Sequence, residues 1–139
     1  MKLVRLFGHP IVLIIIYLLL IIEGDNFGGF FVLYLILSLP HGALYAVLAA
    51  LGIASLIVAF NFKNNFRNWI TAILYLFGYI LMIVSLLVFF AKGNKWESFT
   101  LGIPLMSFIL FGLTSLFFLF NSITIILRDI GKTDKSYSI

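Results

Sequence analysis

The chain has no cysteine and little charge. Cysteine is absent from all 139 residues, only two residues are histidine, and 10% are charged. The lack of cysteine excludes disulfides, thiol redox centres and metal sites built on thiolates. Because soluble domains carry about 25% charged residues, the low charge also excludes an ordinary soluble domain.

Apolar residues make up 63% of the chain and gather in four long runs, residues 3–22, 30–60, 69–91 and 99–127. Each run reaches the ~20 residues that a helix needs to cross ~30 Å of hydrocarbon. A lone segment in lipid must be helical to satisfy its backbone hydrogen bonds. The joints of seven or eight residues make consecutive helices antiparallel neighbours. The sequence therefore predicts an all-α fold, with one integral membrane domain over residues 1–139 that forms a four-span transmembrane helical bundle in up-down-up-down order.

The prolines and the first run give expectations about single helices. Pro40 and Pro104 lie inside the second and fourth runs, and neighbouring helices can satisfy the carbonyls that a proline frees. We therefore expect kinks at these prolines and not helix ends. The first run lacks a small-residue cleavage site before Glu23, so we expect a retained helix and not a secretory signal. Apart from Tyr17 it is almost wholly aliphatic, and we expect it to be the most lipid-exposed helix or to meet another protein.

The distribution of basic residues predicts the orientation in the membrane. Seven of the nine basic residues fall on one side of the predicted bundle: Lys2, Arg5, Lys63, Arg67, Arg128, Lys132 and Lys135. The positive-inside rule then places both termini in the cytoplasm, and Trp69 and Trp96 begin spans at opposite interfaces. Minimal loops and basic ends favour a bacterial inner membrane. Since the cations are split among short segments, the net charge of +4 does not indicate a nucleic-acid partner.

Small and polar residues recur every seven positions within the last three runs. The rows contain Ser38, His41, Tyr45 and Gly52 in the second run, Thr71, Gly78 and Ser85 in the third, and Ser107, Thr114 and Asn121 in the fourth. In lipid such residues mark the faces where helices meet, and a seven-residue repeat favours left-handed packing. We interpret these residues as a packing seam. A polar path through the bundle is the alternative.

His9 and His41 raise the question of a haem. Both lie sixteen residues from Asp25, so two continuous antiparallel helices would hold them at similar depth, as a haem clamped between helices requires. The competing interpretation is that His41 hydrogen-bonds within the bundle, to Tyr45 or Tyr34 on the same face. We predict no bound cofactor.

Catalytic and proton-coupling groups are lacking within the apolar runs. The acidic residues all lie in joints or tails, which disfavours transporters that depend on an embedded carboxylate. No nucleophile elbow, zinc-protease or phosphate-loop motif occurs, so we predict that the chain is not an enzyme.

Two main hypotheses for function remain. The first is a non-catalytic subunit or accessory factor that contacts both the lipid bilayer and partner subunits of a larger membrane complex. The second is a homo-oligomeric channel or carrier that uses the hydroxyl and amide seam. A haem-carrying electron-transfer subunit, with His9 and His41 as ligands, is a third interpretation.

Overall fold

The computed structural model describes residues 8–22, 28–62, 68–93 and 102–136. Their elements are α2 (Pro10–Leu18), strands β1 (Ile21–Ile22) and β2 (Gly29–Phe30), α3 (Phe31–Ser38), the 3-10 helix η1 (Leu39–His41), α4 (Leu44–Asn61), α5 (Asn68–Gly93) and α6 (Gly102–Ser136). Apart from the two short strands, which pair antiparallel, the elements are helical. The all-α fold class is confirmed.

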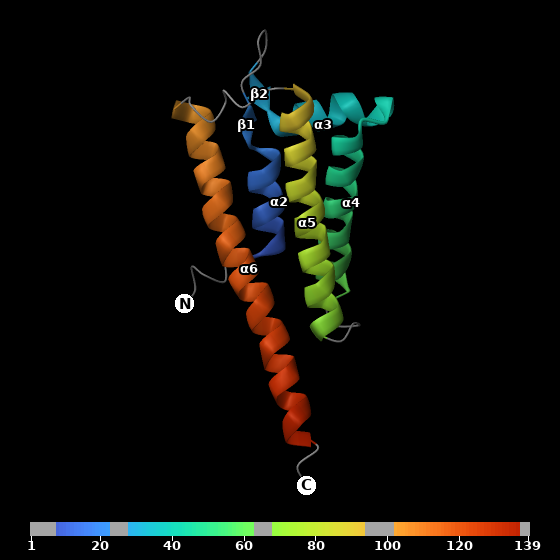
Figure 1. Ribbon diagram of the computed structural model, residues 1–139, viewed down its shortest axis with the longest axis vertical. Coiled ribbons are helices and arrows are strands. Elements are labelled where there is room, and N and C mark those ends of the chain that lie inside the picture. Colours follow the sequence, from blue (N-terminus) through green and yellow to red (C-terminus); the bar gives the residue numbers. More distant parts are fainter. Residues whose placement is uncertain (1–7, 23–27, 63–67, 94–101, 137–139) are drawn as a thin grey trace.

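Among the described residues, three helices are long and apolar enough to cross a membrane. The candidate spans are Leu44–Asn61 in α4, Trp69–Lys92 in α5 and Gly102–Ile125 in α6. Together with α2 they run along the long axis of the molecule in alternating directions (Figure 1). These spans are those of a multi-pass membrane protein. The predicted first span is not confirmed, because its described part holds only the nine-residue helix α2.

The first run becomes a short helix followed by extended chain. His9 caps α2, since its Nδ1 accepts from the backbone N–H of Ile11 at 3.3 Å. Beyond α2 the chain is no longer helical, yet Leu20 and Ile22 are fully buried. Its backbone groups find partners: Phe31 donates to the Leu20 carbonyl at 2.7 Å, and Ile22 pairs with β2. Non-helical backbone at membrane depth is tolerated only where protein surrounds and satisfies it, as here.

The second run is two helices and not one kinked helix, so the expectation of a kink at Pro40 was wrong. The chain leaves η1 through Gly42, whose φ of 66° is left-handed. The N–H of Gly42 bonds to the Leu39 carbonyl and that of Ala43 to the Ser38 carbonyl, which is a Schellman motif. The segment formed by α3 and η1 lies across the bundle axis, while α4 runs along it (Figure 1).

Pro104 also differs from the expected kink. It is the third residue of α6, in the first turn, where a missing backbone N–H costs no intrahelical hydrogen bond. The helix then runs without a break to Ser136.

The core lies among α2, α4, α5 and α6, with α4 and α5 as the most extensively packed pair. Leu13 and Tyr17 of α2 are fully buried, and α2 packs on α6 and α4. The expectation that the first run forms the most lipid-exposed helix was therefore wrong. The basic residues at positions 2, 5, 63 and 67, and Trp96, lie outside the described residues. The orientation of the termini and the left-handed packing stay predictions.

Candidate functional site

Two glycines of the predicted seam bring α4 and α5 into backbone contact. A Cβ added to Gly52 would lie 2.8 Å from the carbonyl oxygen of Gly78, and a Cβ added to Gly78 would lie 2.8 Å from that of Gly52. Met82 and Leu56 would also be touched, at 3.0 Å. One turn away, the hydroxyl of Ser55 donates across the interface to the Leu74 carbonyl at 3.0 Å. This is the close approach that small residues permit between helices in lipid.

Ser85 joins three elements through a buried hydrogen-bond chain. The hydroxyl of Tyr17 on α2 donates to Ser85 Oγ at 3.0 Å, and Ser85 Oγ donates to the backbone carbonyl of Tyr45 on α4 at 2.6 Å. The hydroxyl of Tyr45 in turn hydrogen-bonds that of Ser38 on α3. Tyr17 and Ser85 are fully buried. The chain therefore fixes the positions of α2, α3 and α4 around α5.

An aromatic cluster surrounds this hydrogen-bond chain, and the sequence pattern did not indicate it. Phe89 of α5 is its centre, with ring centroids 5.1 Å from Phe31 and Tyr45, 5.4 Å from Tyr34 and 5.6 Å from Phe90. The contacts are edge-to-face, the arrangement that aromatic quadrupoles favour. Nothing in the sequence distinguishes Phe89 within its apolar run, because only the tertiary fold brings the rings of Phe31, Tyr34 and Tyr45 to it.

The seam residues of α6 hold the first segment at both ends. Ser107 Oγ accepts from the backbone N–H of Ile21 at 3.1 Å, and Asn121 Nδ2 donates to the carbonyl of Gly8 at 3.3 Å. Thr114 lies between them, almost fully buried, and donates within its own helix to the Leu110 carbonyl at 2.9 Å. Two of the three predicted α6 residues thus bond backbone groups that the short α2 leaves without helical partners.

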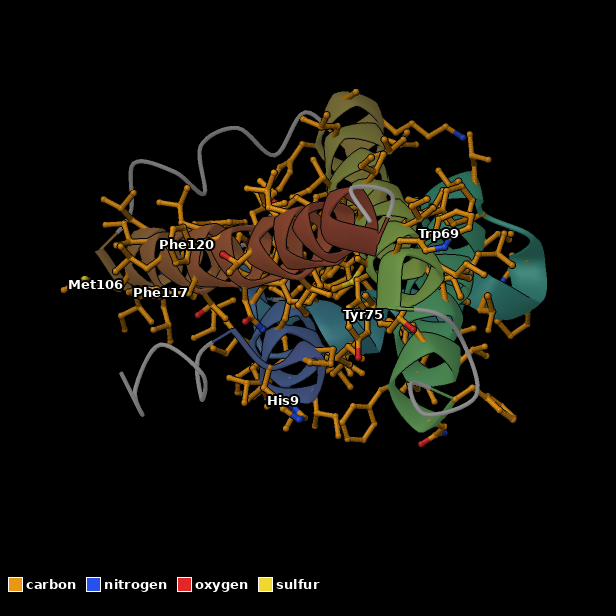
Figure 2. The ribbon with its side chains drawn as sticks, turned by 90° about the horizontal axis from the view of Figure 1, so that it is seen from below. His9, Trp69, Tyr75, Met106, Phe117 and Phe120 are labelled. Carbon is orange, nitrogen blue, oxygen red and sulfur yellow. The ribbon has the colours of Figure 1, made fainter. Side chains whose placement is uncertain are left out.

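Three further polar residues are buried: Thr71 on α5, and Ser115 and Ser122 on α6. Thr71, predicted as part of the seam, lies near the start of α5 and is 6% exposed. Ser115, which the prediction missed, is 4% exposed, and its hydroxyl has no hydrogen-bond partner among the described residues. The row Phe108, Ser115 and Ser122 has the same seven-residue spacing as the predicted row beside it, and that spacing could have indicated Ser115. Tyr75, one turn after Thr71, lies in the middle of the bundle seen from below (Figure 2), and its ring contacts that of Phe118 at 5.8 Å.

The two histidines are far apart. The ring of His9 stacks edge-on against Phe60 at 4.9 Å, near the last residue of α4. His41 lies beyond the opposite end of α4, is exposed, and its Nδ1 hydrogen-bonds the Leu37 carbonyl at 3.0 Å. Since the 18 residues of α4 extend about 27 Å, the structure does not hold the histidines at the similar depth predicted for them. The hydroxyl of Tyr45, one of the two partners expected for His41, is bonded to that of Ser38 instead.

The hydroxyls of the described seam bond mostly to backbone carbonyls. Within residues 8–22, 28–62, 68–93 and 102–136 no three His, Cys, Asp or Glu side chains gather where they could hold a metal ion. The hydroxyls of Ser85, Ser107 and Thr114 all donate to backbone carbonyls. The bond from Ser85 joins α5 to α4, and those from Ser107 and Thr114 lie within α6. No protein-family model matches the chain, and no curated protein or solved structure shows significant similarity to it.

Proposed function

We propose that this multi-pass membrane protein is a non-catalytic subunit or accessory factor of a larger membrane complex. The distribution of basic residues supports a bacterial inner membrane with both termini in the cytoplasm. The observation that carries the proposal is helix α6, the longest of the described helices, whose candidate span lies largely outside the protein interior. The other described helices give it neighbours on one side only.

The two sides of α6 differ along its whole span. Phe111, Thr114 and Phe118 are buried against α2 and α5. The opposite side carries large apolar residues that are all more than half exposed: Ile103, Met106, Leu113, Leu116, Phe120 and Leu127. Figure 2 shows Met106, Phe117 and Phe120 on the flank of α6 that points away from the other helices. Lipid can cover this side within the membrane.

Lipid does not account for the remainder of α6. The helix continues for 11 residues beyond its candidate span and extends past the ends of the other helices (Figure 1). At 1.5 Å per residue the 35-residue helix is about 52 Å long, against a hydrocarbon thickness of ~30 Å. This stretch continues a formed helix and needs no new nucleus, but helices in proteins take most of their stability from tertiary packing, so we infer that it requires a packing partner. A partner subunit that follows α6 out of the membrane meets this requirement.

The burial of the seam argues against a pore built from several copies. Such a pore would need the hydroxyl and amide groups on the outer surface, where copies meet. Thr71, Ser85 and Thr114 are instead buried inside one chain, and Ser107 and Asn121 bond the backbone of the first segment. The outer surface of the described spans is apolar.

The test is site-specific photo-crosslinking in the native host at native expression. A benzophenone amino acid replaces Phe120 of α6, with Phe77 of α5 as the matched control, since both are exposed phenylalanines within candidate spans. We expect a single stoichiometric adduct from position 120 that also co-purifies in mild detergent, and none from position 77. A solitary monomer without adducts would refute the proposal. An adduct only with further copies of this chain would refute it in favour of the channel hypothesis, which liposome flux of the Asn121→Leu and Thr114→Leu variants would then examine.

A further inference from the structure

The segment formed by α3 and η1 is an apolar element that does not span the membrane. Residues Phe31–His41 form a short apolar helix, about half the length that a crossing needs. The segment lies across the axis of the bundle at one end, and its η1 end projects sideways past α4 in both views (Figures 1 and 2). Part of it therefore has no helix beneath it.

One face of the segment packs on the bundle and the other carries leucine and isoleucine. Phe31 is fully buried and Leu35 is 7% exposed. On the other face Leu33, Ile36 and Leu37 are 53%, 62% and 71% exposed. Positions 33, 36, 37 and 40 follow the i, i+3, i+4, i+7 spacing of one helix face. We call Leu33, Ile36, Leu37 and Pro40 the α3 stripe. In water, such a stripe would be an unfavourable surface.

The depth of the segment follows from its contacts with α5. The rings of Phe31 and Tyr34 lie 5.1 and 5.4 Å from that of Phe89. Phe89 lies three residues before Lys92, an exposed cation at the end of the candidate span of α5. Three helical residues rise about 4.5 Å, so the segment lies roughly one turn inside the polar boundary that Lys92 marks. It continues directly into the exposed apolar surface of α4, where Leu44, Val47 and Leu51 face outward.

We propose that α3 and η1 lie in the plane of the membrane and embed the α3 stripe in the acyl chains of one leaflet. The partner of this surface is the bilayer itself. The short span of α4 agrees with this arrangement, because its 18 residues extend about 27 Å against a core of ~30 Å, so its Gly42 end can lie a few ångströms inside the headgroup boundary. The Schellman turn at Gly42 supplies the sharp change of direction between the in-plane segment and the crossing helix.

The natural lack of cysteine makes the depth of the segment measurable without changing any other residue. Nitroxide labels on Leu37→Cys, Ile80→Cys and Lys92→Cys of the full chain in phosphatidylcholine–phosphatidylglycerol vesicles report collisions with oxygen and with a water-soluble nickel chelate. Ile80, exposed at the centre of the α5 span, is the reference for the middle of the bilayer. Leu35→Cys is the control on the opposite face of α3.

The expected depth at Leu37 is about 5–10 Å below the headgroup boundary, against about 15 Å at Ile80, which is half of a ~30 Å core. Leu35→Cys is expected to be shielded from both collision agents. Nickel access at Leu37 equal to that at Lys92 would place the segment in water and overturn the proposal. Shielding of Leu37 from both agents would mean that protein covers the stripe, and would also overturn it. Leu33→Cys repeats the measurement on the same stripe if Leu37→Cys does not incorporate.

Discussion

Helices α4 and α5 touch at Gly52 and Gly78, and an alanine at either position is expected to push them apart. The atom that a new methyl group meets first is a backbone oxygen, 2.8 Å away, and not the flexible end of a side chain. Ordinary contact begins at about 3.4 Å, so the two backbones must part by about 0.6 Å. Interiors are close-packed, so the strain spreads into the neighbouring contacts of Met82 and Leu56.

The magnitude follows from two opposing effects. Forcing one extra methyl group into a packed interface costs about 1–3 kcal/mol. Replacing glycine by alanine inside a helix returns up to about 1 kcal/mol of helix propensity. Gly112 of α6 isolates the second effect, because a Cβ there meets nothing within 4 Å. The difference between Gly52→Ala and Gly112→Ala therefore measures the packing cost alone, which we expect to be about 1–3 kcal/mol.

The assay is the free energy of unfolding of the purified protein in mixed micelles, followed by circular dichroism as the fraction of sodium dodecyl sulfate rises. We expect Gly52→Ala and Gly78→Ala to be destabilised and Gly112→Ala to equal or exceed the parent. The double variant of the two contact glycines should lose less than the sum of the single variants, because the first methyl group has already separated the helices. Equal stability of Gly52→Ala and Gly112→Ala would refute the backbone contact on which the reasoning rests.

Three further substitutions probe single contacts. Ser85→Ala should lower the free energy of unfolding by about 0.6 to 1.7 kcal/mol, the range for hydrogen bonds in membrane bundles. The loss should be smaller in a Tyr17→Phe background, and a double-mutant cycle in the same unfolding assay checks this. Asn121→Ala removes the hydrogen bond to the carbonyl of Gly8, so amide hydrogen exchange in α2 should be faster than in the parent protein, while exchange in α4 stays unchanged. Exchange rates in α2 equal to those of the parent would contradict the contact. Gly42→Ala should cost about 1–2 kcal/mol from its left-handed backbone alone, and thermal melts should show Gly42→Asn to be less destabilised.

The sequence was most informative where helices are long and uniform. Runs 69–91 and 99–127 correspond to α5 and α6, because twenty or more apolar residues leave the backbone no alternative to a helix in lipid. Small residues were informative as well. Gly52 and Gly78 stand out in an apolar run, and the structure places them against each other. The aromatic cluster around Phe89 could not be found in this way, because lipid-facing and buried phenylalanines look alike in a sequence this apolar.

The two helix ends that the sequence concealed have different causes. At residues 40–42 the signal was present: glycine is the residue that most often ends a helix in a left-handed Schellman turn, and Pro40 just before it disfavours a continuous helix, although hydropathy alone conceals both. At Leu18 no local signal exists. The chain after Leu18 is isoleucine and leucine like the chain before it, and isoleucine suits a strand as well as it suits a lipid-facing helix.

What ends α2 is supplied by distant residues. Ser107 of α6 accepts from the N–H of Ile21, and β2 pairs with β1, so two groups that a continuing helix would have satisfied internally are satisfied by other parts of the fold. Extended chain at membrane depth is stable only with such partners. Ser107 of the α6 seam therefore has a structural role: it satisfies a backbone group of the first segment. Ser107 donates its only proton to the Pro104 carbonyl and accepts from Ile21, so little hydrogen-bonding capacity is left for a solute, which weighs against a channel path through this part of the seam.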